Sequence, residues 1–177
     1  MLIGKPFLTS EQIQKRVKEL ARNISNDYEG HEILAVGILK GAFMFFADIV
    51  KQIQVPMDID FLVVSSYIKT ETTGKVKIHA DLREDIKGKH VLLFEDIVDT
   101  GLTLKYIKDT LFNRQPASLK ICAFLDKKAH RQVDLEPDYT GYKIPDEYVV
   151  GYGLDYDNKY RNLPYIAVFK EDSHIKS

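Results

Sequence analysis

The chain has 177 residues, 45% of them hydrophobic and 29% charged, a composition typical of one soluble globular domain spanning residues 1–177. The net charge of −1 lacks the basic excess of nucleic-acid-binding proteins, and no apolar run approaches the roughly 20 residues of a membrane span. The single cysteine, Cys122, lies in an apolar run without a disulfide partner, which favours a core position and a reducing, cytoplasmic location.

The first predicted element is an amphipathic helix over residues 10–25. Thr9 and Gln12 have the spacing of a capping box, and apolar residues then recur at helical intervals. This helix is interpreted as scaffold.

A strand-turn-helix unit follows. The apolar run Ile33–Leu39 predicts a buried strand, and a long apolar helix ends near Ile53. Between them, Gly41 permits close approach to a ligand and Lys40 adds positive charge beside helix amides. A turn of this kind is more often a connector than a binding site.

A second strand is predicted at residues 59–64, and the polar segment 65–74 after it has no hydrophobic period. Polar loops of this length are often lids or disordered segments. The residues alone leave these two possibilities equal.

The most unusual chemistry follows the apolar run Val91–Phe94, which predicts a strand buried on both faces. The next positions carry three acids and then small residues suited to opening a helix, namely Glu95, Asp96, Asp99, Thr100, Gly101 and Thr103. Free amides at a helix start hold an anion, whereas carboxylates repel one. A ligand that offers both a phosphate and sugar hydroxyls or a metal cation, such as a phosphorylated sugar with Mg²⁺, satisfies both groups.

A simple capped helix start is the alternative, with Asp99 or Thr100 as N-cap and the other acids solvated. Three acids against a buried strand favour a functional site over this alternative.

The helix that follows is predicted to end near Asn113, and a strand is predicted at residues 119–125. Helices that alternate with buried strands predict an α/β fold with a mainly parallel sheet and helices on both faces. Lys40, Asp99 and Lys127 each follow a strand end, where such sheets bind ligands, and are expected to converge.

The last third is rich in Tyr, Gly and Pro, which predicts short strands and turns. The charge cluster around Lys127 is by default a solvated loop. The five histidines, His130 among them, lack metal-ligand spacing and are interpreted as exposed or capping residues.

The run of two acids, two apolar residues and Asp-Thr-Gly-x-Thr resembles the pyrophosphoryl-ribose motif of the type I phosphoribosyltransferases, and of their purine-salvage branch in particular. The resemblance extends from Ile33 to Val168. It implies the α/β fold of that family, a mainly parallel sheet flanked by helices, with a small hood region.

The resemblance also implies phosphate-binding and lid residues. The 5-phosphate would be bound by Thr100, Gly101, Leu102 and Thr103, and the pyrophosphate by Lys40, Gly41 and Arg161. A mobile loop would carry the lid residues Ser66 and Tyr67.

Other positions match the family's catalytic, metal and purine-binding residues. Asp99 would be the general base, and Glu95 and Asp96 the ribose and metal shell. The purine would be bound by Lys127, Tyr148, Val149 and Asp155, and the metal by Glu95, Asp96 and Asp155.

Taken together, the resemblance implies transfer of a 5-phosphoribosyl group from 5-phosphoribosyl 1-diphosphate to hypoxanthine, and also to guanine, with release of pyrophosphate. Mg²⁺ is the implied cofactor, the partners are small-molecule substrates, and the assembly is a homodimer or homotetramer. A sensing regulator of the same fold that binds nucleic acid or a protein is the main alternative. A phosphoacceptor domain is the other, and it leaves the Thr-Gly-x-Thr run and Arg161 without a role.

Overall fold

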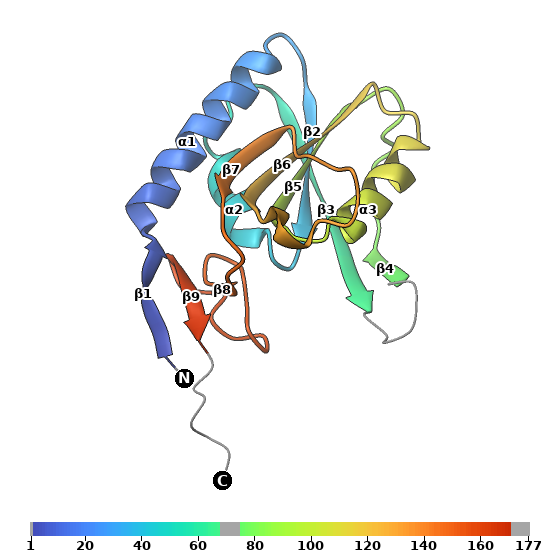
Figure 1. Cartoon of the computed structure of the whole chain (residues 1–177). Coiled ribbons are helices and arrows are strands. Elements are labelled where there is room, and N and C mark those ends of the chain that lie inside the picture. The colour runs from blue at the N-terminus through green and yellow to red at the C-terminus, as the bar shows by residue number, and fades with distance from the viewer. Residues whose placement is uncertain (1, 68–74, 171–177) are drawn as a thin grey trace.

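The computed structural model describes residues 2–67 and 75–170, and its centre is a six-stranded sheet (Figure 1). The strand order is β4-β3-β2-β5-β6-β7, and every neighbouring pair except β3 and β4 is parallel. The strands are β2 (Ile33–Leu39), β3 (Met57–Tyr67), β4 (Lys75–Ala80), β5 (His90–Val98), β6 (Ser118–Asp126) and β7 (Tyr139–Lys143). The predicted mainly parallel α/β sheet is confirmed.

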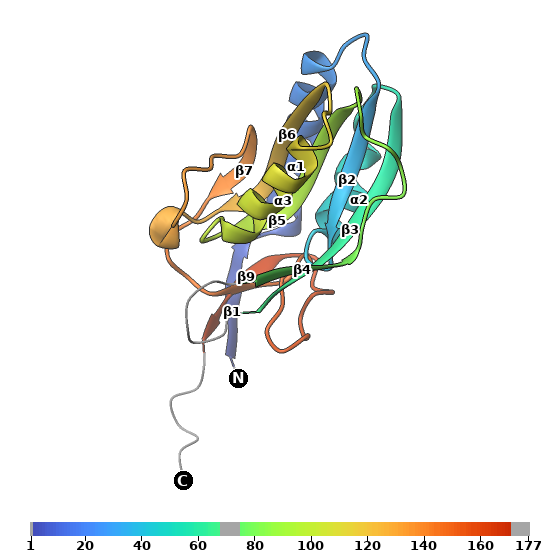
Figure 2. The ribbon, with the colours of Figure 1, turned by 90° about the vertical axis from the view of Figure 1, so that its right-hand side faces the viewer.

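Helices cover both faces of this sheet, so the central strands are buried on both sides (Figures 1 and 2). Helices α1 (Ser10–Asp27) and α2 (Phe43–Val50) pack on one face, and α3 (Leu102–Phe112) packs on the other. The Thr9 side chain and the Gln12 side chain form the predicted capping box at the start of α1. Among the described residues, no helix is long and apolar enough to cross a membrane.

A second, antiparallel sheet lies beside the carboxyl ends of the main strands (Figure 1). It consists of β1 (Leu2–Leu8), β9 (Ile166–Lys170) and β8 (Val149–Val150), in that order. This sheet corresponds to the hood region implied by the family resemblance. Its first strand was not predicted, because pairing with a segment more than 150 residues away leaves no local sequence signal.

Several boundaries differ from the sequence-based expectation. Helix α2 ends at Val50, short of Ile53. The segment expected to be irregular from residue 65 instead continues β3 through Tyr67, because residues 63–67 pair with β4, which was not predicted. The remainder of the expected lid loop, residues 68–74, lies outside the described residues.

Candidate active site

The parallel register of β5 and β6 brings two predicted site residues together. Val98 lies opposite Asp126, and the Lys127 amide donates to the Val98 carbonyl at 2.9 Å. Asp99 and Lys127 are the next residues on the two strands, and the Lys127 Nζ lies 3.0 Å from Asp99 Oδ2. The predicted general base and the predicted purine-contacting lysine therefore form an ion pair.

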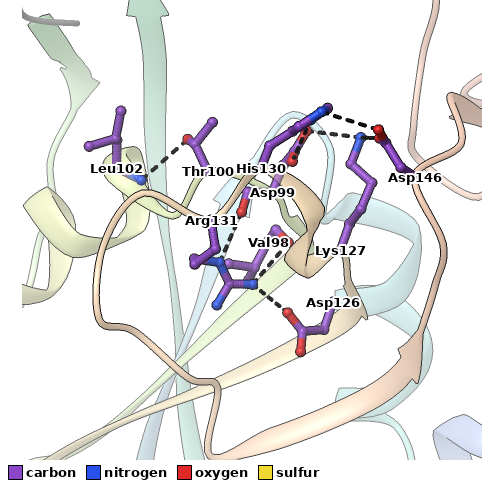
Figure 3. Close-up of polar contacts among 9 residues, drawn as sticks. All are labelled: Val98, Asp99, Thr100, Leu102, Asp126, Lys127, His130, Arg131 and Asp146. Carbon is purple, nitrogen blue, oxygen red and sulfur yellow. Dashed lines mark hydrogen bonds and ion pairs between the residues drawn. The ribbon is translucent and has the colours of Figure 1, made fainter.

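Two residues that the sequence analysis did not assign complete this cluster (Figure 3). Asp146 Oδ1 lies 3.6 Å from the Lys127 Nζ. The His130 ring lies between the two carboxylates, with Nδ1 3.5 Å from Asp99 Oδ1 and Nε2 3.2 Å from Asp146 Oδ2. His130 comes from the 3₁₀ helix η1 (Lys128–His130) and is exposed, as the sequence suggested, but its ring also contacts both carboxylates.

Arg131 fixes the main chain that carries Asp99 (Figure 3). Its Nε donates to the Asp99 carbonyl at 2.9 Å and its Nη2 to the Val98 carbonyl at 3.3 Å. The same guanidinium pairs with the carboxylate of Asp126, whose side chain is fully buried, and also donates to the Leu135 carbonyl. The ends of β5 and β6 are therefore joined by one buried charged group.

The predicted 5-phosphate loop opens helix α3. Gly101 is its N-cap with φ +79°, and a Cβ there would lie 2.8 Å from Val133 Cγ2, so only glycine fits. The loop lines a cavity of about 130 Å³ into which Glu95 and Asp99 also face; its other lining residues include Thr100 and Thr103. Amides at the start of a helix bind anions.

The predicted pyrophosphate loop packs directly against an acid of β5. A Cβ on Gly41 would lie 1.8 Å from Asp96 Oδ2, and a Cβ on Gly153 would lie 2.0 Å from the Gly41 carbonyl. Arg161 Nη1 donates to the Gly153 carbonyl at 2.7 Å. Close glycine contacts thus bring Gly41, Asp96 and Arg161 together from three separate segments. The Leu39–Lys40 peptide bond of this loop is cis.

Glu95 and Asp96 lie within β5, whereas the sequence analysis placed them after the strand. Burial raises the pKa of Glu95 well above its usual range, and the neighbouring Asp96 charge raises this pKa further. Burial also raises the pKa of Asp96, while hydrogen bonds and the nearby Arg161 charge oppose that effect. Two adjacent acids that are costly to ionise favour a site that receives a cation.

Tyr148, one of the residues predicted to bind the purine, is 54% exposed, and its ring contacts the rings of Tyr156 and Phe169 in T-shaped geometry. Its hydroxyl donates to the Asp155 carbonyl at 3.1 Å. Burial raises the pKa of Tyr148, and the nearby Asp155 charge adds to this, while the charges of Lys127 and Arg161 oppose it. Val149 begins β8 and is buried.

Most of the predicted site residues therefore meet at the carboxyl ends of β2, β5 and β6. The three predicted metal ligands are an exception. Asp155 pairs with Arg161 at 2.7 Å, and the described residues contain no group of three or more acidic, His or Cys side chains arranged to hold a metal. Ser66 and Tyr67 are the last two residues of β3, and the rest of the predicted lid lies outside the described residues.

The sequence analysis missed Asp146 and the roles of His130, Arg131 and Gly153. Gly153 and Arg131 had detectable signals, because Gly153 follows Tyr152 in a segment rich in Tyr and Gly and Arg131 belongs to a charge cluster, but Asp146 had none.

A larger cavity, of about 310 Å³, lies at the opposite end of the main strands, where Glu32, Asp58 and Lys89 are among the lining residues. It lacks the paired acids, glycine loops and helix start that occur together at the carboxyl ends. The chemistry therefore favours the smaller cavity.

Comparison with known proteins shows which family the chain resembles along most of its length. Residues 6–157 match the family described as phosphoribosyl transferase domain. The chain is 51% identical to the hypoxanthine-guanine phosphoribosyltransferase of Staphylococcus aureus, covering 94% of this chain and 93% of that protein. It is 47% identical to the Streptococcus pneumoniae protein of the same name, covering 96% and 95%.

A crystal structure of a hypoxanthine-guanine phosphoribosyltransferase from Bacillus anthracis, with a HEPES molecule in its active site, matches this fold with a TM-score of 0.91. The two chains are 49% identical, and the match covers 96% of this chain and 100% of that one.

Proposed function

The chain belongs to the phosphoribosyl transferase family, and we infer from its relatives and its site that it is a purine-salvage enzyme. It transfers the 5-phosphoribosyl group of 5-phosphoribosyl 1-diphosphate to hypoxanthine, and also to guanine, giving the nucleotide and pyrophosphate. The observation that carries this proposal is the Asp99–Lys127 pair, which lies beside the helix start that lines the smaller cavity.

Asp99 acts as the general base. Attack by the purine nitrogen on the anomeric carbon requires removal of a ring proton, and Asp99 is both next to the phosphate loop and ion-paired with Lys127. As the bond to pyrophosphate breaks, positive charge develops on the ribose. The carboxylates of Glu95 and Asp96 stabilise that charge.

Mg²⁺ fits the donor set of the site. Glu95 and Asp96 are adjacent carboxylates whose pKa values are raised by burial, so a cation relieves the cost of ionising them. Mg²⁺ typically binds one or two carboxylates together with substrate phosphates and water, a set that two adjacent acids beside a phosphate site would provide. When bound, it neutralises charge on the leaving pyrophosphate. Asp155, which pairs with Arg161 at 2.7 Å, would join Glu95 and Asp96 in holding the ion when Arg161 binds the pyrophosphate.

Lys127 selects the purine. An ammonium offers three donors and no acceptor, so it pairs with the 6-oxygen of hypoxanthine or guanine but meets a donor at the amino group of adenine. Tyr148 stacks on the ring and the Val149 main chain contacts its edge. Stacking alone does not distinguish purines, because all of them present similar faces.

The alternative of a sensing regulator is not supported by the relatives, which carry the names of enzymes. The proposed partners are small molecules, with neither nucleic acid nor membrane among them, and the proposed location is the cytoplasm. A homodimer or homotetramer is proposed because large apolar side chains are exposed together on β3, where Ile59 is 51% and Phe61 41% exposed. Analytical ultracentrifugation at several concentrations tests this assembly.

A substrate panel tests the proposed function. The protein is incubated with 5-phosphoribosyl 1-diphosphate, Mg²⁺ and one of hypoxanthine, guanine, xanthine or adenine, and nucleotide products are separated by chromatography. IMP from hypoxanthine and GMP from guanine are expected, with adenine disfavoured by about 10⁴-fold in catalytic efficiency. Equal use of adenine and hypoxanthine contradicts the assigned role of Lys127.

A further inference from the structure

The Lys127 side chain is enclosed by two carboxylates, and only one of them has a role in the proposed reaction. Its side chain is 10% exposed, with Asp99 Oδ2 at 3.0 Å and Asp146 Oδ1 at 3.6 Å from the ammonium. A buried ammonium needs a counter-charge, because an unpaired charge of low exposure is strongly disfavoured. Asp99 supplies that charge only while it is ionised.

The proposed reaction removes Asp99 as a partner of Lys127. Asp99 must face the purine nitrogen and then accept its proton, which neutralises the carboxylate. The third nearby acid, Asp126, is engaged by Arg131. Asp146 is then the remaining carboxylate within ion-pair distance of Lys127 among the described residues.

Asp146 is itself held in place by a side chain. His130 Nε2 lies 3.2 Å from Asp146 Oδ2, while the other ring nitrogen faces Asp99 at 3.5 Å (Figure 3). This contact orients the carboxylate toward Lys127, although Asp146 lies on an exposed loop before β8 and is 52% exposed. The exposure means that the fold does not depend on Asp146.

We propose that Asp146 is a positioning residue for purine selection, which stays ion-paired with the Lys127 ammonium and directs it at the 6-oxygen when Asp99 turns to the substrate. This inference rests on the proposed function. It assigns Asp146 no contact with the purine, so its effect is confined to ligands that carry a 6-oxygen.

Nucleotide binding tests the inference without turnover. Dissociation constants for IMP and AMP are measured by calorimetry on wild type and on Asp146→Asn. The substitution is expected to weaken IMP binding about tenfold, because part of one charge-assisted hydrogen bond is lost, and to leave AMP binding unchanged. The KM for hypoxanthine should rise in parallel, while kcat and the affinity for 5-phosphoribosyl 1-diphosphate stay within about twofold.

Two further variants isolate the effect of the charge. Asp146→Glu keeps the carboxylate and should restore IMP affinity to within about threefold of wild type. The matched control is Glu147→Gln, because Glu147 is an exposed acid at the next position and its side chain makes no ion pair with Lys127. It should bind IMP and AMP like wild type.

If Asp146→Asn weakens IMP binding and AMP binding equally, the inference is overturned, because the substitution then has a general structural effect. Unchanged IMP affinity overturns it as well. Failure of the proposed function is a distinct result. Wild type would then make no IMP from hypoxanthine, whatever the ratio of the IMP and AMP dissociation constants in the variants.

Discussion

At the scale of single residues, the site combines charges that are stable only in the presence of one another or of a ligand. Asp99 and Lys127 neutralise each other at 3.0 Å, so neither presents an isolated charge before the substrates bind. Glu95 and Asp96 accept hydrogen bonds from the Asp96 and Ile97 amides, but neither is in an ion pair within the part of the chain that the structure describes, and burial raises the pKa of both. Three substitutions separate these roles.

Asp99→Asn removes the proposed general base and keeps the size of the side chain. Turnover should fall by about 10² to 10⁴, while binding of 5-phosphoribosyl 1-diphosphate changes little. Steady-state kinetics and ligand titration measure the two quantities. Turnover within a few fold of wild type would limit Asp99 to a capping role.

Lys127→Met removes the ammonium and keeps most of the apolar side chain. The catalytic efficiency with hypoxanthine should fall by about 10² or more, and its advantage over adenine should narrow, because the discriminating donor is lost. Lys128→Met is the matched control, since Lys128 pairs with Glu136 at 2.7 Å outside the cluster. An unchanged ratio of efficiencies in Lys127→Met would refute the assignment.

Glu95→Gln should stabilise the ligand-free protein while lowering its activity. Because the folded-state pKa of Glu95 is raised above 4.5, the folded protein holds this proton to higher pH than the unfolded chain. Stability is therefore lost as pH rises above that value, until Glu95 ionises in the folded state too. Removing the acid should add about 0.5–2 kcal/mol near neutral pH.

Urea unfolding of both proteins at acidic and neutral pH measures this difference. The advantage of Glu95→Gln should be greater at neutral pH. If the unfolding free energies of the two proteins differ by the same amount at both pH values, or do not differ at either, ionisation of Glu95 costs the folded protein no stability.

At the scale of secondary-structure elements, the register between β5 and β6 determines which residues meet. Val98 opposite Asp126 makes Asp99 and Lys127 neighbours, and Arg131 locks this arrangement by binding both strand ends. Loss of the Arg131 guanidinium should lower the stability of the protein, because the Asp126 side chain is fully buried and would lose its counter-charge.

Arg131→Met should destabilise the protein by about 3–5 kcal/mol, since it leaves the Asp126 carboxylate buried without a counter-charge. The double variant Asp126→Leu, Arg131→Met should recover much of this loss. Arg114→Met is the control, because Arg114 pairs with Asp81 at the surface and should contribute less than about 1 kcal/mol. Urea unfolding measures all three. A double variant no more stable than Arg131→Met would show that the buried carboxylate is not the cause.

The sequence predicted the elements with strong local patterns. Helix α1 follows from regular apolar spacing and strand β2 from a continuous apolar run, and the acids beside Thr-Gly-x-Thr lie at the carboxyl end of β5 as the pattern indicated. Pairings between distant segments could not be predicted. Strand β1 depends on β9, and Asp146 reaches Lys127 only through the folding of the loop before β8. His130 is exposed as expected, but its contacts with Asp99 and Asp146 come from tertiary structure and had no local signal.

At the scale of the whole molecule, the site is assembled from two sheets. Strand β5 supplies Asp96, and Asp99 and Lys127 directly follow β5 and β6. Tyr148 and Arg161 lie on either side of β8 along the chain. The contact between Gly153 and the Gly41 carbonyl fixes the two parts against each other. Substrates that contact both parts should therefore stabilise the whole chain.

Mg²⁺ should be required for this joint binding. With saturating 5-phosphoribosyl 1-diphosphate, excess chelator should abolish activity, and added Mg²⁺ should restore it. Thermal unfolding should show stabilisation by the diphosphate only with Mg²⁺ present. Full activity in chelator would exclude the proposed role of Glu95 and Asp96 in a metal shell.

The most direct test of the account is the stoichiometry of the complete reaction. Wild-type protein is mixed with hypoxanthine, 5-phosphoribosyl 1-diphosphate and Mg²⁺, and IMP and pyrophosphate are quantified in the same samples. The proposed reaction should give one IMP and one pyrophosphate for each hypoxanthine consumed, with little pyrophosphate when hypoxanthine is omitted. Pyrophosphate release that is independent of hypoxanthine, or the absence of IMP, would contradict it.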